Sequence, residues 1–196
     1  SPVTNSSWHG THVAGTVAAV TNNGIGVAGV SYDAKVQHVR VLGRCGGLLS
    51  DISDGVVWAS GGVVSGVPVN ATPASVINMS LVGRRKIAAE KKAFKSLYHR
   101  GILSIAAAGN EGSEEHGYPA SYDSVVSVAG VDENMLVADF ATYNNQVELA
   151  APAVNVLSTE PYIKIAELTV DRTPYSGILI KNAAYGQASG PLVDGG

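Results

Sequence analysis

The chain has 196 residues, of which 45% are hydrophobic and 15% charged, and its formal net charge is −3. A chain of this length and apolar content can bury a substantial core, which argues against an intrinsically disordered segment. The acidic balance and the lack of any basic cluster larger than residues 84–86, expected to be a solvated face, argue against a nucleic-acid partner. No apolar run reaches the roughly 18 residues of a membrane span, so we expect no membrane partner.

The first third of the chain contains two predicted helices and one predicted strand. Residues 9–19 form the first helix, in which small residues, Gly15 among them, permit close packing against a neighbouring segment. Residues 34–41 alternate in the manner of a strand. Ser50 is the expected N-cap of a second, short helix. Cys45 is the only cysteine, so it is either a free thiol or half of a disulfide with a partner outside this chain.

Strands and helices continue to alternate through the middle of the chain. Residues 76–81 form a short apolar strand, and residues 86–100 form the clearest helix, with Gly101 as its stop signal. Residues 102–107 and 125–131 are two further apolar strands. Apolar strands joined by helices indicate a parallel sheet covered on both faces. The predicted fold class is therefore α/β, a three-layer sandwich with a mostly parallel sheet.

The composition changes near Pro161. Residues 164–181 alternate as β-strands do, with no helix signal between them. We therefore predict a domain boundary at about residue 162, with the α/β domain over residues 1–162 and the truncated start of a β-rich unit over residues 163–196.

Two polar residues stand where chemistry is expected. His9 opens the first helix, and a rigid scaffold suits a general base that must hold its position. Asn110 follows the strand that ends at residue 107, and open α/β sheets bind ligands at the carboxyl ends of their strands. The small residues before Asn110 let a substrate backbone approach, so its amide could donate an N–H to a developing oxyanion. The alternative is a turn asparagine beside two glycines.

His9 and His12 also allow a second interpretation, a metal hydrolase. A zinc-binding helix carries histidines at positions i and i+4 with a glutamate between them. Here the two histidines are three residues apart, and Gly10 and Thr11 lie between them. We therefore expect His12 to be a packed, hydrogen-bonded histidine.

Four segments resemble those of the subtilisin family of serine proteases, and the resemblance extends over roughly residues 6–160. They are residues 8–19, 105–112, 118–126 and 147–152. The resemblance implies that His9 is the catalytic histidine, that Asn110 is the oxyanion donor, and that the substrates are proteins or peptides.

The same resemblance implies a substrate-binding cleft. The strand over residues 76–81 would pair with an extended substrate, and Gly46 and Gly47 would form the opposite edge. The primary specificity pocket would be walled by Ser80, Leu81, Val82, Ala107, Ala108 and Gly109. Family members usually carry glycine in place of Val82, so we expect a narrowed pocket that prefers smaller residues on the acyl side of the cut.

Residues 20–27 resemble the family's calcium loop, which implies a structural Ca²⁺ ion. The implied ligands are the carbonyls of Val20, Ile25 and Val27 and the side chain of Asn23, with Asn22 as the alternative to Asn23. Oxygen donors of these kinds suit calcium. A simple Asn-Gly turn is the other interpretation.

The family's other two catalytic residues are not found in this chain. The aspartate motif precedes the histidine, and the Gly-Thr-Ser-Met-Ala motif of the nucleophile follows the position of Thr159 in members without insertions. Residues 183–196 resemble the start of the protease-associated domain that some bacterial members insert before that serine. We therefore expect this segment to be inactive alone. The resemblance also implies that the full precursor is secreted and carries an N-terminal propeptide. A catalytically inactive, peptide-binding homologue is the alternative.

Overall fold

The computed structural model describes residues 7–43, 46–160, 168–170 and 173–175, the last two ranges by their backbone alone. The chain divides into two compact units. One consists of Val39–Val154, and the other of Ser1–His38 with Asn155–Gly196. Each unit is described by itself below.

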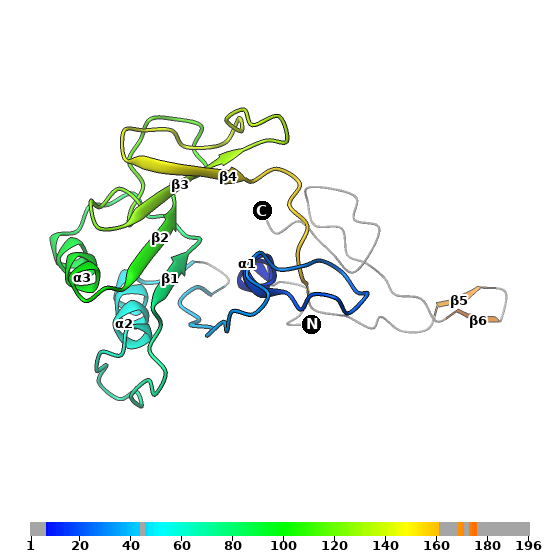
Figure 1. The fold of residues 1–196 in the computed structure, drawn as a ribbon, viewed down its shortest axis with the longest axis horizontal. Coiled ribbons are helices and arrows are strands. Elements are labelled where there is room, and N and C mark those ends of the chain that lie inside the picture. Colours follow the sequence, from blue (N-terminus) through cyan, green and yellow to red (C-terminus); the bar gives the residue numbers. More distant parts are fainter. Residues whose placement is uncertain (1–6, 44–45, 161–167, 171–172, 176–196) are drawn as a thin grey trace. The chain divides into compact units, whose positions relative to one another are not determined.

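A parallel four-stranded sheet is the centre of the unit Val39–Val154. Its strands are β1 (Val76–Met79), β2 (Leu103–Ala107), β3 (Val126–Val131) and β4 (Val147–Pro152), in the order β1-β2-β3-β4 (Figure 1). Every neighbouring pair of these strands is parallel. The α/β class predicted from the sequence is therefore confirmed.

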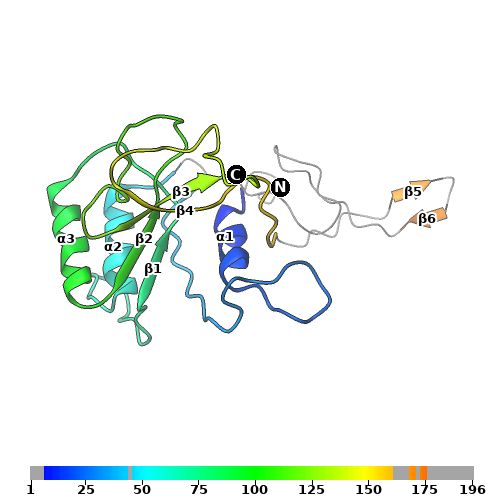
Figure 2. The ribbon, with the colours of Figure 1, turned by 45° about the horizontal axis from the view of Figure 1, so that its top comes forward.

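Helices α2 (Leu49–Ala59) and α3 (Ala88–His99) lie beside strands β1 and β2 (Figure 2). Together with alternate residues of the strands they supply the core of this unit. The core cluster includes Val56 of α2, Phe94 of α3, and Ile77 and Met79 of β1. Val76, on the other face of β1, is 52% exposed. Among the described residues of this unit, both helices thus pack against the same face of the sheet.

The clearest predicted helix, α3, is fixed at both ends. At its C-terminus Gly101 has a φ of 76°, and the N–H groups of Gly101 and Ile102 donate to the carbonyls of Tyr98 and Leu97 at 3.0 Å each. This arrangement is a Schellman motif, as the glycine predicted. It stops α3 and leads the chain into β2.

At the other end of α3, the buried Tyr122 hydroxyl accepts the Ile87 N–H at 2.9 Å and donates to Glu90 Oε2 at 2.7 Å. Burial and, after it, the adjacent Glu90 carboxyl together raise the pKa of Tyr122 to about 12, although the hydrogen bond from the Ile87 N–H acts in the opposite direction. The hydroxyl therefore keeps its proton and its bond to Glu90.

Helix α1 (His9–Ala18) organises the other unit. Its one buried residue is Gly15, and a Cβ placed there would clash with the Thr159 hydroxyl and lie 2.8 Å from Thr159 Cβ. The Ser158 and Thr159 hydroxyls donate to the carbonyls of His12 and Thr11, at 2.5 and 2.9 Å. The close packing that the small residues of the helix predict is therefore present.

The strand predicted over residues 34–41 was wrong. No strand is found there, because no described segment forms a backbone ladder with it. A strand exists only with a bonded neighbour, and alternation in the sequence does not supply one. The second helix also begins at Leu49, after Leu48 as N-cap, so the expected Ser50 cap lies inside the helix.

Within the predicted β-rich tail, Leu168–Val170 (β5) pairs antiparallel with Thr173–Tyr175 (β6). The boundary near residue 162 and the segment 183–196 lie outside the described residues, so the two-domain division stays a prediction. None of the helices that the structure describes is long and apolar enough to cross a membrane.

Candidate active site

His9 is the first residue of α1, directly after a strained residue. Trp8 has a φ of 56°, in the left-handed region that a bulky side chain rarely adopts. Such outliers cost of order 1–3 kcal/mol and cluster at functional sites. Burial lowers the pKa of His9, and repulsion from a charge on His12 lowers it further. The imidazole is therefore neutral at neutral pH and free to accept a proton.

We expect the His9 imidazole to titrate below its ordinary pKa of 6.5. Folding disfavours the charged imidazole, so protonation of His9 destabilises the fold as the pH falls. This loss of stability takes place between pH 6.5 and the lower pKa that His9 has in the folded state. NMR of the His9 ring protons as a function of pH measures this pKa. In a His12→Ala variant the pKa should rise, yet stay below 6.5, because burial is the larger of the two causes. A His9 pKa above 6.5 in the original chain would contradict this.

His12 is held in place by a hydrogen bond. Its Nε2 lies 3.2 Å from the carbonyl oxygen of Val156, so this nitrogen carries the proton and donates it. The packed, hydrogen-bonded histidine predicted from the sequence is thus confirmed. In the part of the chain that the structure describes, no three His, Cys, Asp or Glu side chains are grouped so as to hold a metal ion.

The two predicted pocket walls follow neighbouring strands of the sheet. Ser80, Leu81 and Val82 come directly after β1, and Ala107 is the last residue of β2, followed by Ala108 and Gly109. Gly83 and Tyr118 exchange two backbone hydrogen bonds, of 2.7 and 2.8 Å. Because β1 and β2 are adjacent and parallel, their carboxyl ends bring both walls to one edge of the sheet.

The Val82 side chain reaches across this edge. A Cβ placed on Gly109 would lie 3.8 Å from Val82 Cγ2, and one placed on Gly117 would lie 2.5 Å from it. Gly117 was not among the predicted site residues. Its missing side chain is what makes room for Val82, and this nonlocal contact has no signal in the sequence.

Asn110 follows Gly109, whose φ of 130° lies in a region that favours glycine. The loop is anchored on both sides of Asn110. The Thr142 N–H donates to the Gly109 carbonyl at 3.0 Å, and the Gly112 N–H donates to the Phe140 carbonyl at 2.8 Å. Asn110 itself is exposed, and among the described residues its carboxamide makes no hydrogen bond. Its N–H groups are therefore available to a ligand.

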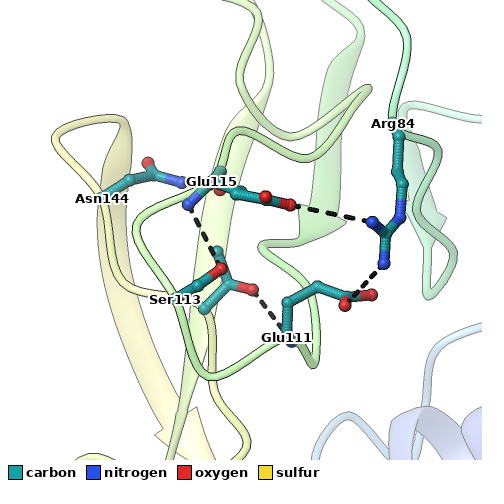
Figure 3. Close-up of polar contacts among 6 residues, drawn as sticks. Arg84, Glu111, Ser113, Glu115 and Asn144 are labelled. Atoms are coloured by element: carbon teal, nitrogen blue, oxygen red, sulfur yellow. Dashed lines mark hydrogen bonds and ion pairs between the residues drawn. The ribbon is translucent and has the colours of Figure 1, made fainter.

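Sequence reasoning missed an ion-pair cluster beside this loop (Figure 3). Nη2 of Arg84 lies 2.7 Å from Oε2 of Glu111, and Nη1 lies 3.9 Å from Oε2 of Glu115. Residue 84 belongs to the basic triplet that was expected to be only solvated. The residues that pair here are 27 or more positions apart in the chain, so no local sequence pattern predicts that they pair.

Gly46 and Gly47 both lie close to other backbone segments of the same unit. Gly46 has a φ of 96° and forms a bridge with Gly43, and a Cβ on Gly47 would clash with the Val41 carbonyl. Backbone conformation at Gly46 and lack of space at Gly47 are therefore sufficient reasons for glycine at these two positions. A role in binding substrate stays a prediction.

The loop over residues 20–27 offers oxygen donors of the kinds that calcium prefers. Asn23 Oδ1 accepts the Ile25 N–H at 3.0 Å, which leaves its second lone pair free. Within the described residues no backbone N–H is bonded to the carbonyls of Val20, Ile25 or Val27. Oxygens of these kinds suit Ca²⁺, but four are fewer than the six to eight that it takes, so an ion bound here would need further ligands from water or from other parts of the protein.

Comparison with known proteins gives a consistent result. The profile of the Subtilase family matches residues 1–189. An extracellular protease of Xanthomonas campestris pv. campestris is 51% identical over 160 residues, which are 81% of this chain and 28% of that protein. Subtilisin DY of Bacillus licheniformis is 42% identical over 81% of this chain and 56% of its own length.

A solved protease structure from Pseudoalteromonas arctica is 50% identical, with a TM-score of 0.73 over 81% of this chain and 46% of that one. The chain thus spans about a quarter to a little over half of the length of these relatives.

Proposed function

Because the chain belongs to the subtilase family, we propose that the whole protein is a serine endopeptidase that hydrolyses peptide bonds in proteins. The observation that carries this proposal furthest is the unpaired carboxamide of Asn110, on an anchored loop at the carboxyl edge of a parallel sheet. Supporting it is His9, whose lowered pKa keeps it ready to take a proton.

In the proposed mechanism neutral His9 accepts the proton of a serine hydroxyl, and the freed oxygen attacks the scissile carbonyl. The tetrahedral intermediate carries a negative oxygen, to which the Asn110 side chain donates an N–H. His9 then gives its proton to the leaving amine, and a water molecule completes hydrolysis by the same steps. The serine and the aspartate that orients His9 are expected from parts of the protein outside this chain.

The test is hydrolysis of unfolded casein by the full-length protein. We expect cleavage that a serine-directed sulfonyl fluoride stops and that zinc chelators leave unchanged. Tight binding of peptides without hydrolysis would instead favour the inactive, peptide-binding homologue, for which the presence of Val82 in the predicted pocket wall is the one favourable observation.

Val82→Gly is expected to widen the specificity pocket. Removing the side chain empties the space between Gly109 and Gly117, so large apolar side chains should gain access. We expect the original protein to prefer small residues on the acyl side of the cut. For the variant we expect kcat/KM for phenylalanine relative to alanine to rise by at least about tenfold, the effect of one or two buried methylene groups. Cleavage of a peptide library measures it, and Val137→Gly, a change at a loop residue that is 58% exposed, is the control. A phenylalanine preference before the change would contradict the account.

We propose that a structural Ca²⁺ ion binds the loop over residues 20–27, through the carbonyls of Val20, Ile25 and Val27 and the side chain of Asn23. Chelating calcium should lower the melting temperature of the full-length protein, because a ligand that binds only the folded state stabilises it. Asn23→Ala should lower it in calcium and make it insensitive to chelator. Asn22→Ala distinguishes the two candidate ligands, because it should leave the melting temperature sensitive to chelator if Asn23 is the ligand. If chelator does not change the melting temperature of the original protein, the calcium site is refuted.

Secretion and an N-terminal propeptide are also proposed for the whole protein. Two relatives, from Xanthomonas campestris and Dichelobacter nodosus, are named as extracellular proteases, which supports secretion. Mass spectrometry of the protein recovered from culture medium would show where its mature N-terminus lies.

A further inference from the structure

The ion-pair cluster joins the ends of the two pocket walls. Arg84 lies two residues beyond Val82, and Glu111 directly follows Asn110. The guanidinium reaches both Glu111 and Glu115, at 2.7 and 3.9 Å, so a positive charge faces the carboxylate beside the proposed oxyanion donor (Figure 3).

The backbone around Glu111 does not depend on this ion pair. The Glu111 N–H donates to Thr142 Oγ1 at 3.3 Å, and the residues on either side of the loop are bonded to Thr142 and Phe140. The side chains of Arg84 and Glu111 are 72% and 44% exposed, and ion pairs this exposed stabilise a fold little. Loss of Arg84 would therefore leave the loop in place and change mainly the charge at its surface.

We propose that Arg84 is a specificity-determining residue that masks the Glu111 carboxylate and so keeps the pocket entrance from attracting cationic substrate side chains. The inference rests on the proposed peptidase function. A carboxylate already paired with a guanidinium offers little to a substrate ammonium, whereas an unpaired one attracts it. With Arg84 in place, the substrate is selected by the size of the side chain that fits beside Val82, and not by attraction of its charge to Glu111.

The experiment compares two fluorogenic peptides that differ only in the residue on the acyl side of the cut, lysine or the uncharged methionine of similar length. In the full-length protein, Arg84→Ala should raise the ratio of kcat/KM for lysine to that for methionine by about two- to fivefold, as expected for an exposed charge pair. The gain should vanish in 1 M NaCl, where the screening length is about 3 Å. The double variant R84A/E111Q should return to the original ratio.

Lys91→Ala is the matched control, because Lys91 forms a similarly exposed pair with Asp123 at 2.9 Å. It should leave the ratio unchanged. An unchanged ratio in Arg84→Ala, or a gain that persists in R84A/E111Q, overturns the inference. If no form of the protein cleaves either peptide, the proposed function fails instead. Calorimetric binding of the same two peptides then decides the inference, which requires the lysine peptide to gain affinity in Arg84→Ala.

Discussion

Replacing His9 by alanine in the full-length protein is expected to lower kcat by about six orders of magnitude, the loss measured in subtilisin when its triad histidine is removed. Without the imidazole nothing takes the serine proton, so the serine must attack the carbonyl as a neutral, weakly nucleophilic hydroxyl. Substrate affinity should change little, because the pocket walls come from another part of the chain. Steady-state kinetics at protein concentrations determined by absorbance measures both quantities.

The fold should survive this change. His9 is only partly buried, and the hydrogen bond found at this residue is made by its backbone N–H, to Ser7 Oγ at 3.4 Å. The melting temperature should therefore stay close to that of the original protein. His99→Ala, an exposed change at the end of α3, is the control and should keep full activity. A His9→Ala protein with more than about a hundredth of the original kcat would contradict the assigned role.

Asn110→Ala is expected to lower kcat by about 10²–10³ with KM nearly unchanged, the effect of removing one oxyanion-hole donor in subtilisin, equal to about 2.7–4 kcal/mol. The carboxamide should bond the oxygen only when it becomes negative, so the loss appears in the transition state and not in substrate binding. Because the Asn110 carboxamide makes no hydrogen bond within the described residues, Asn110→Ala removes no hydrogen bond that stabilises the fold.

The control is Asn145→Ala, at an exposed asparagine of the same unit, which should leave kcat unchanged. An Asn110→Ala variant that raises KM and keeps kcat would show that this residue binds substrate in its ground state. One that lowers the melting temperature by many degrees would favour the turn-forming asparagine instead.

Elements with strong local signals were predictable from the sequence. The apolar face of α3 and the glycine that ends it define that helix to within two residues, and three apolar runs became β1, β2 and β3. The small residues of α1 likewise predicted that it packs closely against a neighbour, which the structure shows to be residues 158–159. In each case the information lies within one turn or one strand of the chain.

Features that depend on distant partners were not predictable. Residues 34–41 alternate as a strand does but have no ladder partner among the described residues. The fit of Val82 against Gly117 and the pairing of Arg84 with Glu111 join segments about 30 residues apart, and each is visible only once the sheet edge is built. Because the proposals on specificity rest on these two contacts, the family resemblance alone could not have suggested them.

The assignment to a serine-dependent reaction is tested most directly by a fluorophosphonate probe that bonds only an activated serine, with the labelled peptide identified by mass spectrometry. We predict that the full-length protein is labelled at one serine, and that His9→Ala abolishes the labelling while His99→Ala does not. Equal labelling with and without the His9 imidazole, or hydrolysis that a metal chelator stops and the probe does not, would contradict the account.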